Sequence, residues 1–291
     1  MLLSGINYIS NHGTSQGILT RFFLHFEKMA EMGFMGKRWP AAKSRYELYE
    51  KKNKEDFTNF YDTYHEVMKL REEYLQGVNN GTYFSINLDG STSSDSTPEI
   101  LIRKRIKEFF ISGRQLLNNF GKSGLLEDGD FKVSSFLLYK ESVVEKYIKT
   151  FSENFRYKQG YLKIIDIAKK AQVDFKKDFM QLRADIEHDY DTEIPKFKIC
   201  AYNREAVVEE PTYNGTNFFI LIDKYYHGTL NLIEDMAAYF YGVNACANTD
   251  GKITLFFRKD EVDPPRFRFR YALTLDVGDP SLQRLINPRR A

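Results

Sequence analysis

Apolar residues recur at every third or fourth position along most of the chain, which is the spacing of one face of an α-helix. This pattern predicts helices at about 16–33, 41–77, 97–120, 135–156, 159–188 and 218–242. The most regular stripe lies in 159–188 and consists of Ile164, Ala168, Ala171, Phe175, Phe179, Leu182 and Ile186. A stripe of that length is suited to packing in a helical bundle or across a dimer.

Other segments have a different character. Residues 78–96 are rich in Asn, Gly, Ser and Asp, a composition typical of turns and linkers, and they contain the main predicted domain boundary. Residues 196–210 are ambiguous and include a candidate strand. Residues 252–257 and 266–271 are predicted to be strands of a C-terminal hairpin, because the second alternates strictly and two prolines lie in the connection.

The sequence therefore predicts a mainly α fold, a helical bundle with a small C-terminal antiparallel β element. We expect three parts: a helical N-terminal region at 1–90, a bundle at 91–245 and a β-hairpin tail at 246–291. The helix after the first boundary is expected to begin at Thr97, a capping residue, followed by Pro98 at the first helical position. Two Asn-Gly-Thr triplets, at Asn80 and Asn214, match the glycosylation pattern but are interpreted as turns.

Composition narrows the class of protein. Hydrophobic residues make up 42% and charged residues 28% of the chain, as expected for a globular protein. A formal net charge of +2 gives no global reason to expect nucleic acid or a membrane surface, so any basic site is local. The two cysteines are far apart, which fits a reducing compartment. Neither a signal peptide nor a membrane-spanning apolar stretch is recognisable, so we expect a cytoplasmic protein without membrane contact.

Several common sites are not supported by the residue pattern. Residues 121–123 read Gly-Lys-Ser, but Leu116 stands where a phosphate-binding loop needs its first glycine. The histidines and cysteines lack ligand spacing, so no metal or other cofactor is expected. Arg266, Arg268 and Arg270 alternate with aromatic residues, which fits phosphate binding or, more commonly, an exposed charged strand face over a buried aromatic one.

One short segment carries candidate chemistry. Residues 183–190 read Arg-Ala-Asp-Ile-Glu-His-Asp-Tyr and follow the most regular helical stripe to its end. Arg183, four further residues and then His188 at the end of a long helix, with Tyr190 two positions on, resemble the signature of the HEPN superfamily. The resemblance covers at most residues 97–245, and its specific part is this segment alone.

The resemblance implies an all-helical and usually dimeric protein. Many members of this superfamily are metal-independent endoribonucleases of antiviral defence or toxin–antitoxin systems, which cleave RNA by attack of its own 2′-hydroxyl. Arg183 and His188 would then be catalytic, and Asp185, Glu187 and Tyr190 would contact RNA or support the site. The matching tyrosine is a target for modification by the antitoxin in the toxin branch. The implied partners are therefore RNA, an antitoxin and a second copy of the chain in a homodimer.

The chemistry is coherent without a metal, because histidine can transfer a proton near neutral pH and arginine can stabilise the charge of the phosphate. Side chains five residues apart on an ideal helix differ in direction by about 140°. The helix must therefore end or distort near His188, or a second subunit must complete the site.

The competing hypothesis is structural. In it, Arg183 pairs with Asp185, Glu187 or an acid on a neighbouring helix, and His188 is a cation favoured by the dipole at a helix C-terminus. The chain would then be a catalytically inert helical binding or scaffold protein.

Overall fold

The computed structural model describes residues 39–122, 127–128, 131–132, 158–188, 194, 196–202, 205–248, 253–258, 271–275 and 282–284. The helices predicted at 16–33 and 135–156 lie outside the described residues, as do Tyr190 and the three arginines at 266–270.

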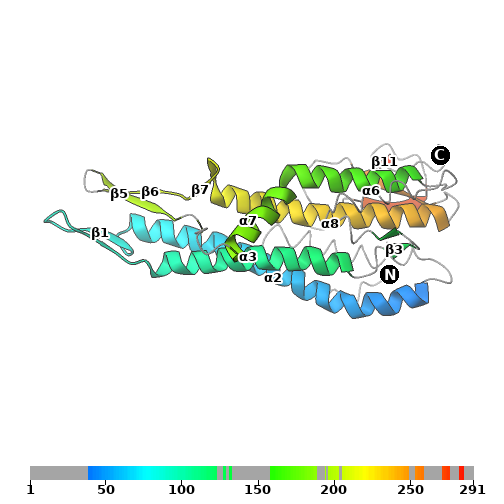
Figure 1. Cartoon of the computed structure of the whole chain (residues 1–291), viewed down its shortest axis with the longest axis horizontal. Coiled ribbons are helices and arrows are strands. Elements are labelled where there is room, and N and C mark those ends of the chain that lie inside the picture. The colour runs from blue at the N-terminus through cyan, green and yellow to red at the C-terminus, as the bar shows by residue number, and fades with distance from the viewer. Residues whose placement is uncertain are drawn as a thin grey trace. The chain divides into compact units, whose positions relative to one another are not determined.

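The described residues are mainly helical, with small antiparallel strand pairs, as the apolar spacing predicts (Figure 1). The long helical segments are α2 (Trp39–Asn79), α3 (Thr97–Lys122), α6 (Lys158–Ala171) and α8 (Phe218–Asn248). Helix α6 continues through the π-helical turn η1 (Gln172–Lys176) into α7 (Lys177–His188). Within the part of the chain that the structure describes, no helix has both the length and the apolar character needed to cross a membrane.

The strands form small antiparallel pairs. Three hairpins connect helices, namely β1 (Phe84–Ile86) with β2 (Thr92–Ser94), β5 (Lys198–Tyr202) with β6 (Glu205–Glu209), and β7 (Thr212–Tyr213) with β8 (Thr216–Asn217). A fourth pair joins β3 (Glu127–Asp128) to β4 (Phe131–Lys132). The candidate strand within 196–210 is thus confirmed, and 78–96 contains the hairpin β1–β2.

The C-terminal β element is a three-stranded sheet in the order β10-β9-β11. Its central strand β9 (Ile253–Arg258) matches the predicted strand 252–257. Strand β10 (Tyr271–Leu275) begins where the second predicted strand ends, and β11 (Leu282–Arg284) pairs with the other edge of β9. Strand β11 was missed, because a three-residue segment carries too few positions to show an alternating pattern.

Local polar residues form the turns and caps. Asn214 and Gly215 have φ angles of 49° and 78°, as the hairpin turn between β7 and β8 requires, so this Asn-Gly-Thr triplet is a turn as predicted. The start of α3 differs in detail, because Asp95 Oδ1 accepts a hydrogen bond from the Thr97 amide at 2.9 Å. The capping oxygen at this helix start therefore comes from Asp95, two residues before the predicted cap.

The chain packs as two compact units. Unit 1 comprises Met1–Thr58, Leu116–Asp174 and Leu230–Ala291, and unit 2 comprises Asn59–Gln115 and Phe175–Thr229. Helix α7, which contains Arg183 and His188, lies in unit 2. The predicted division into 1–90, 91–245 and 246–291 stays a prediction.

Unit 1 has a core in which the end of α3 packs on α2. The rings of Phe57 and Phe120 meet edge to face, with centroids 6.3 Å apart. Nearby, Asn119 donates a hydrogen bond of 2.8 Å to the buried carboxylate of Asp56. The apolar stripe residues of α6 that belong to this unit are Ile164, Ala168 and Ala171, and all are buried as predicted.

Unit 2 has an aromatic core to which all four of its helical segments contribute. Phe60 of α2 stacks on Phe109 of α3, with centroids 5.0 Å apart, and Phe110 of α3 stacks on Phe179 of α7 at 5.4 Å. Tyr64 of α2 and Tyr226 of α8 lie almost parallel at 3.9 Å. Part of the high aromatic content therefore fills this core, where large flat side chains bury much apolar area.

Glycine allows two of these helices to approach the rings closely. A Cβ atom on Gly113 would lie 2.6 Å from the Phe60 ring and 2.9 Å from the Phe179 ring. A Cβ atom on Gly228 would lie 2.9 Å from the ring of Phe175 in η1. Glycine weakens a helix by about 1 kcal/mol relative to alanine, but at these positions any larger residue would collide with the core.

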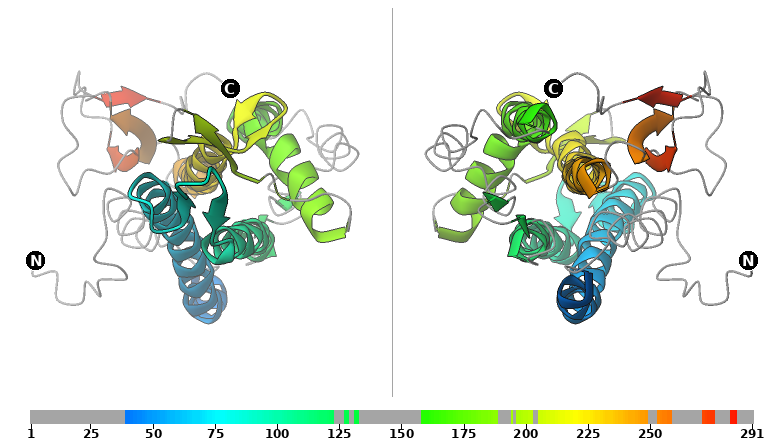
Figure 2. Two further views of the ribbon diagram at one scale, coloured as in Figure 1. Left: turned by 90° about the vertical axis from the view of Figure 1, so that its left-hand side faces the viewer. Right: turned by 90° about the vertical axis from the view of Figure 1, so that its right-hand side faces the viewer.

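Two hairpins extend from the same end of unit 2 (Figure 1). Strands β1 and β6 are neighbours there, and the left-hand view of Figure 2 turns this end toward the viewer. Phe197, which precedes β5, contacts Tyr74 of α2 and Phe219 of α8, with centroids 4.6 and 5.7 Å away. These contacts anchor the chain that leads from α7 into the hairpin β5–β6.

Candidate functional site

The candidate site lies at the C-terminal end of α7, in unit 2. The buried face of α7 is formed by Phe179, Leu182 and Ile186, the last residues of the predicted stripe. Helix α7 is described as far as His188, and the residues directly after it lie outside the described residues. The backbone of His188 is described but its side chain is not, so its role stays a prediction.

Arg183 is buried and held by an acid of its own helix. Its side chain is 10% exposed, and its Nη2 atom contacts the carboxylate of Glu187 one turn later. Its Nε atom is also buried and has no hydrogen-bond partner among the described residues. Burial lowers the pKa of Arg183, and the positive charge of Arg114 lowers it further. The pairing with Glu187 is one that the structural hypothesis names.

A second guanidinium group approaches the same carboxylate. Nη1 of Arg114, on α3, lies 3.9 Å from Oε2 of Glu187, and the Arg114 side chain is 45% exposed. We call Arg114, Arg183 and Glu187 the guanidinium cluster. Two positive groups and one carboxylate give this cluster a formal charge of +1, with its more accessible positive group on α3. Sequence reasoning missed Arg114, since no motif marks it.

Asp185 does not belong to the guanidinium cluster. Its Oδ1 atom accepts a hydrogen bond of 2.7 Å from Nε2 of Gln181, one turn earlier on α7. Side chains two residues apart on a helix differ in direction by about 160°, so Asp185 points away from the side of α7 that carries Arg183. The predicted supporting residues are thus separated: the structure brings Glu187 to Arg183, but not Asp185.

Lys176 is a further perturbed group that sequence reasoning missed. It ends the π-helical turn η1 and is buried, and burial lowers its pKa to about 7. The helical periodicity gave no sign that this charged residue faces inward, because Lys176 lies beside the apolar stripe, one position after Phe175, and not in it.

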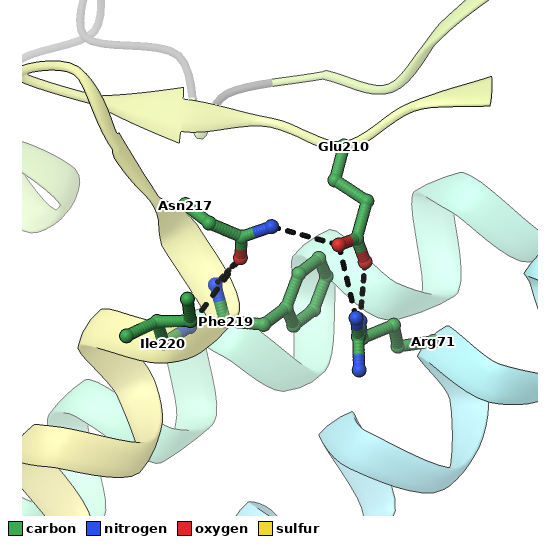
Figure 3. A network of polar contacts seen from close by, with 5 residues as sticks. All are labelled: Arg71, Glu210, Asn217, Phe219 and Ile220. Atoms are coloured by element: carbon green, nitrogen blue, oxygen red, sulfur yellow. Dashed lines mark hydrogen bonds and ion pairs between the residues drawn. The ribbon is translucent and has the colours of Figure 1, made fainter.

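A separate polar network joins three elements of unit 2 (Figure 3). Arg71 of α2 donates two hydrogen bonds to the carboxylate of Glu210, one of them from Nη2 at 2.9 Å. Asn217 donates to the same carboxylate at 2.7 Å, and its Oδ1 accepts from the amides of Phe219 and Ile220. Asn217 therefore caps the N-terminus of α8.

The network in Figure 3 is best explained as structural. The guanidinium of Arg71 also lies over the ring of Phe219, 5.1 Å from its centroid. Its two hydrogen bonds and this stacking fix the position of Arg71. The bond from Arg71 lowers the pKa of Glu210, which keeps that carboxylate charged. The charges of Arg71 and Glu210 therefore neutralise each other within the protein.

The described residues contain no group of three His, Cys, Asp or Glu side chains that could hold a metal ion. No protein-family model matches the chain, and no curated protein or solved structure matches it either.

Proposed function

We propose that the chain is a metal-independent endoribonuclease of HEPN type that acts in a defence or toxin–antitoxin setting. The observation that carries the proposal is the guanidinium cluster, a group with net positive charge that includes Glu187, the residue directly before His188 on α7. The same proposal includes a cytoplasmic homodimer, and an antitoxin that acts on Tyr190.

The proposed reaction needs only groups of the protein and the RNA. The 2′-oxygen attacks the adjacent phosphorus atom, the bond from phosphorus to the 5′-oxygen breaks, and a 2′,3′-cyclic phosphate and a 5′-hydroxyl result. His188 takes the proton of the 2′-hydroxyl and delivers it to the leaving 5′-oxygen, because imidazole exchanges protons readily near neutral pH. Arg114 contacts the phosphate, because its guanidinium is the more exposed of the two. Arg183 positions Glu187 and adds positive charge behind it.

A second candidate function is that of a catalytically inert helical binding or scaffold protein. The burial of Arg183 and its contact with Glu187 favour this candidate, because a guanidinium held in this way is less accessible to a phosphate. In this hypothesis the guanidinium cluster joins α3 to α7 and has no substrate.

RNA cleavage in the presence of a chelator distinguishes the two functions. We expect the parent protein to cleave RNA and leave 2′,3′-cyclic phosphate ends. Substitution of His188→Ala should lower the rate by about 10²- to 10⁴-fold, the usual contribution of general acid–base catalysis. The matched control is His227→Ala, an exposed histidine on α8 that lies 3.4 Å from Asp223, and it should retain the parental rate.

Two results would contradict the nuclease proposal. The first is absence of cleavage by the parent protein on diverse RNAs, and the second is equal cleavage by the parent and the His188→Ala variant. Either result leaves the binding or scaffold function as the one supported by the ion pair between Arg183 and Glu187.

A further inference from the structure

The outward face of α3 in unit 2 carries a stripe of exposed residues. They recur at spacings of 4, 3, 4 and 3 positions and comprise Ile100, Lys104, Lys107, Ile111 and Arg114. On an ideal helix these five side chains lie within a sector of about 80°. We call this set the α3 stripe. It contains three positive charges and no carboxylate.

The charges of Lys104 and Lys107 are not neutralised by ion pairs within the described residues. Arg105 of the same helix, by contrast, is neutralised, because it pairs with Glu66 at 3.0 Å and also with Glu108. The hydrogen bond to Glu108 raises the pKa of Arg105. The α3 stripe is therefore a local excess of positive charge in a chain whose net charge is only +2.

The α3 stripe ends at the guanidinium cluster, because Arg114 belongs to both. Ten residues separate Lys104 from Arg114, which corresponds to about 15 Å along a helix. Besides Glu187, the exposed or half-exposed acids of α7 are Asp178 and Asp185, which differ in direction from Arg183 by about 140° and 160° on an ideal helix. Neither acid therefore faces the side of α7 on which Glu187 meets Arg114.

We propose that the α3 stripe binds the phosphate backbone of single-stranded RNA and leads it to the guanidinium cluster. That the RNA reaches the guanidinium cluster for cleavage rests on the proposed nuclease function, whereas the binding of RNA rests only on the positive charge of the α3 stripe. Lys104, Lys107 and Arg114 contact successive stretches of backbone, and such contacts carry no base specificity. Ile111 lies between Lys107 and Arg114, and Ile100 lies one turn before Lys104. Both offer apolar surface to the sugars and bases.

Binding can be measured on the full chain without cleavage. The probe is a fluorescent single-stranded RNA with 2′-O-methyl groups, which lacks the attacking hydroxyl, and its anisotropy is followed at several salt concentrations. The variant Lys104→Gln with Lys107→Gln should bind about tenfold more weakly. The slope of log affinity against log salt should become shallower by about 1.4, since each phosphate contact contributes about 0.7 for single strands.

The matched control is Lys198→Gln with Lys224→Gln, which removes the same charge from exposed positions on β5 and α8. It should retain parental affinity and salt dependence. Equal weakening in both double variants, no weakening in either, or no RNA binding by the parent protein would overturn the proposal. A further overturning result is that Ile100→Ser with Ile111→Ser turns a dimer into a monomer while the Lys104/Lys107 variant binds RNA normally, because the stripe is then a contact between subunits.

Failure of the stripe and failure of the nuclease are distinguishable. If the parent protein binds RNA through Lys104 and Lys107 but does not cleave it, the binding proposal for the α3 stripe stands and the nuclease proposal is rejected. If cleavage depends on His188 but Lys104→Gln with Lys107→Gln leaves the RNA affinity unchanged, the nuclease proposal stands and the binding proposal for the α3 stripe is rejected.

Discussion

Lys176 shows how the protein interior changes the charge of a single side chain. Burial lowers its pKa from the ordinary 10.5 to about 7. Between these two pH values the unfolded chain holds the proton and the folded chain does not. The free energy of unfolding therefore gains a contribution that rises with pH across this window, by up to about 1.4 kcal/mol per unit. Below pH 7 the full cost of burying the charge is present.

We predict that Lys176→Met is more stable than the parent protein at pH 7 and that this advantage shrinks as the pH is raised to 9. Methionine fills a similar volume and has no charge to bury. Urea unfolding of both proteins at several pH values measures the difference and removes contributions common to both. A difference that stays constant from pH 7 to pH 9 would show that Lys176 keeps its proton in the folded state.

The residues of the candidate site illustrate what a local sequence can reveal. The motif identified Arg183 and named Glu187 as a partner in the structural hypothesis, because residues four apart meet on one helix face. It also grouped Asp185 with them, although helix geometry turns that carboxylate away. Arg114 could not be found, because its proximity to Glu187 depends on how α3 packs beside α7.

At the scale of elements, the start of α8 depends on one amide side chain. Asn217 Oδ1 accepts a hydrogen bond of 2.9 Å from the Phe219 amide, while its Nδ2 atom bonds Glu210. We predict that Asn217→Ala lowers the free energy of unfolding by about 1 kcal/mol, the usual cost of losing a helix N-cap. Chemical denaturation measures the change.

Asn217→Ser separates the two roles of this side chain. Serine keeps an oxygen that can cap the helix but lacks the amide that donates to Glu210. We expect the serine variant to retain most of the parental stability. A loss as large as that of Asn217→Ala would mean that the bond to Glu210, rather than the cap, holds the start of α8.

For the helices, apolar spacing predicts which face is buried but does not reveal a π-helical turn. The stripe from Ile164 to Ile186 predicted the buried face through α6, η1 and α7, including Phe175 within the π-helical turn. Two consecutive spacings of four residues, from Ala171 to Phe175 and from Phe175 to Phe179, coincide with that turn. A π-helical turn contains one residue more than an α-helical turn, and the wider spacing allows for it. Periodicity does not reveal such a turn, because an ordinary helix tolerates the same spacing.

At the scale of the whole molecule, the mainly α class followed from periodicity, whereas the packing units depend on contacts between residues that are far apart in the sequence. The predicted parts are continuous stretches, but each compact unit combines segments that are distant in the sequence. Long helices bring such segments together through contacts between rings, as between Phe60 and Tyr226 in unit 2. The polar segment 78–96 contains a hairpin because Asn, Gly and Ser favour tight turns as well as linkers.

The proposed homodimer makes a prediction that only the assembled molecule can test. Arg183 and His188 differ in direction by about 140° on an ideal helix, so we expect the guanidinium cluster of one subunit, which Arg183 holds in place, and His188 of the other subunit to act on the same phosphate. Two inactive variants, Arg183→Gln and His188→Ala, should then restore activity when they are co-expressed, because each mixed dimer contains one site with both native residues. Random pairing makes half of the dimers mixed, so about a quarter of the parental rate is expected.

Co-purification through two different tags establishes that mixed dimers form, and each variant alone serves as the control. Recovery of activity also shows that the buried position of Arg183 tolerates glutamine. Mixed dimers that form but stay inactive would mean that each subunit holds a complete site of its own. The end of α7 at His188, rather than a second copy of the chain, would then have to bring the imidazole toward the guanidinium cluster.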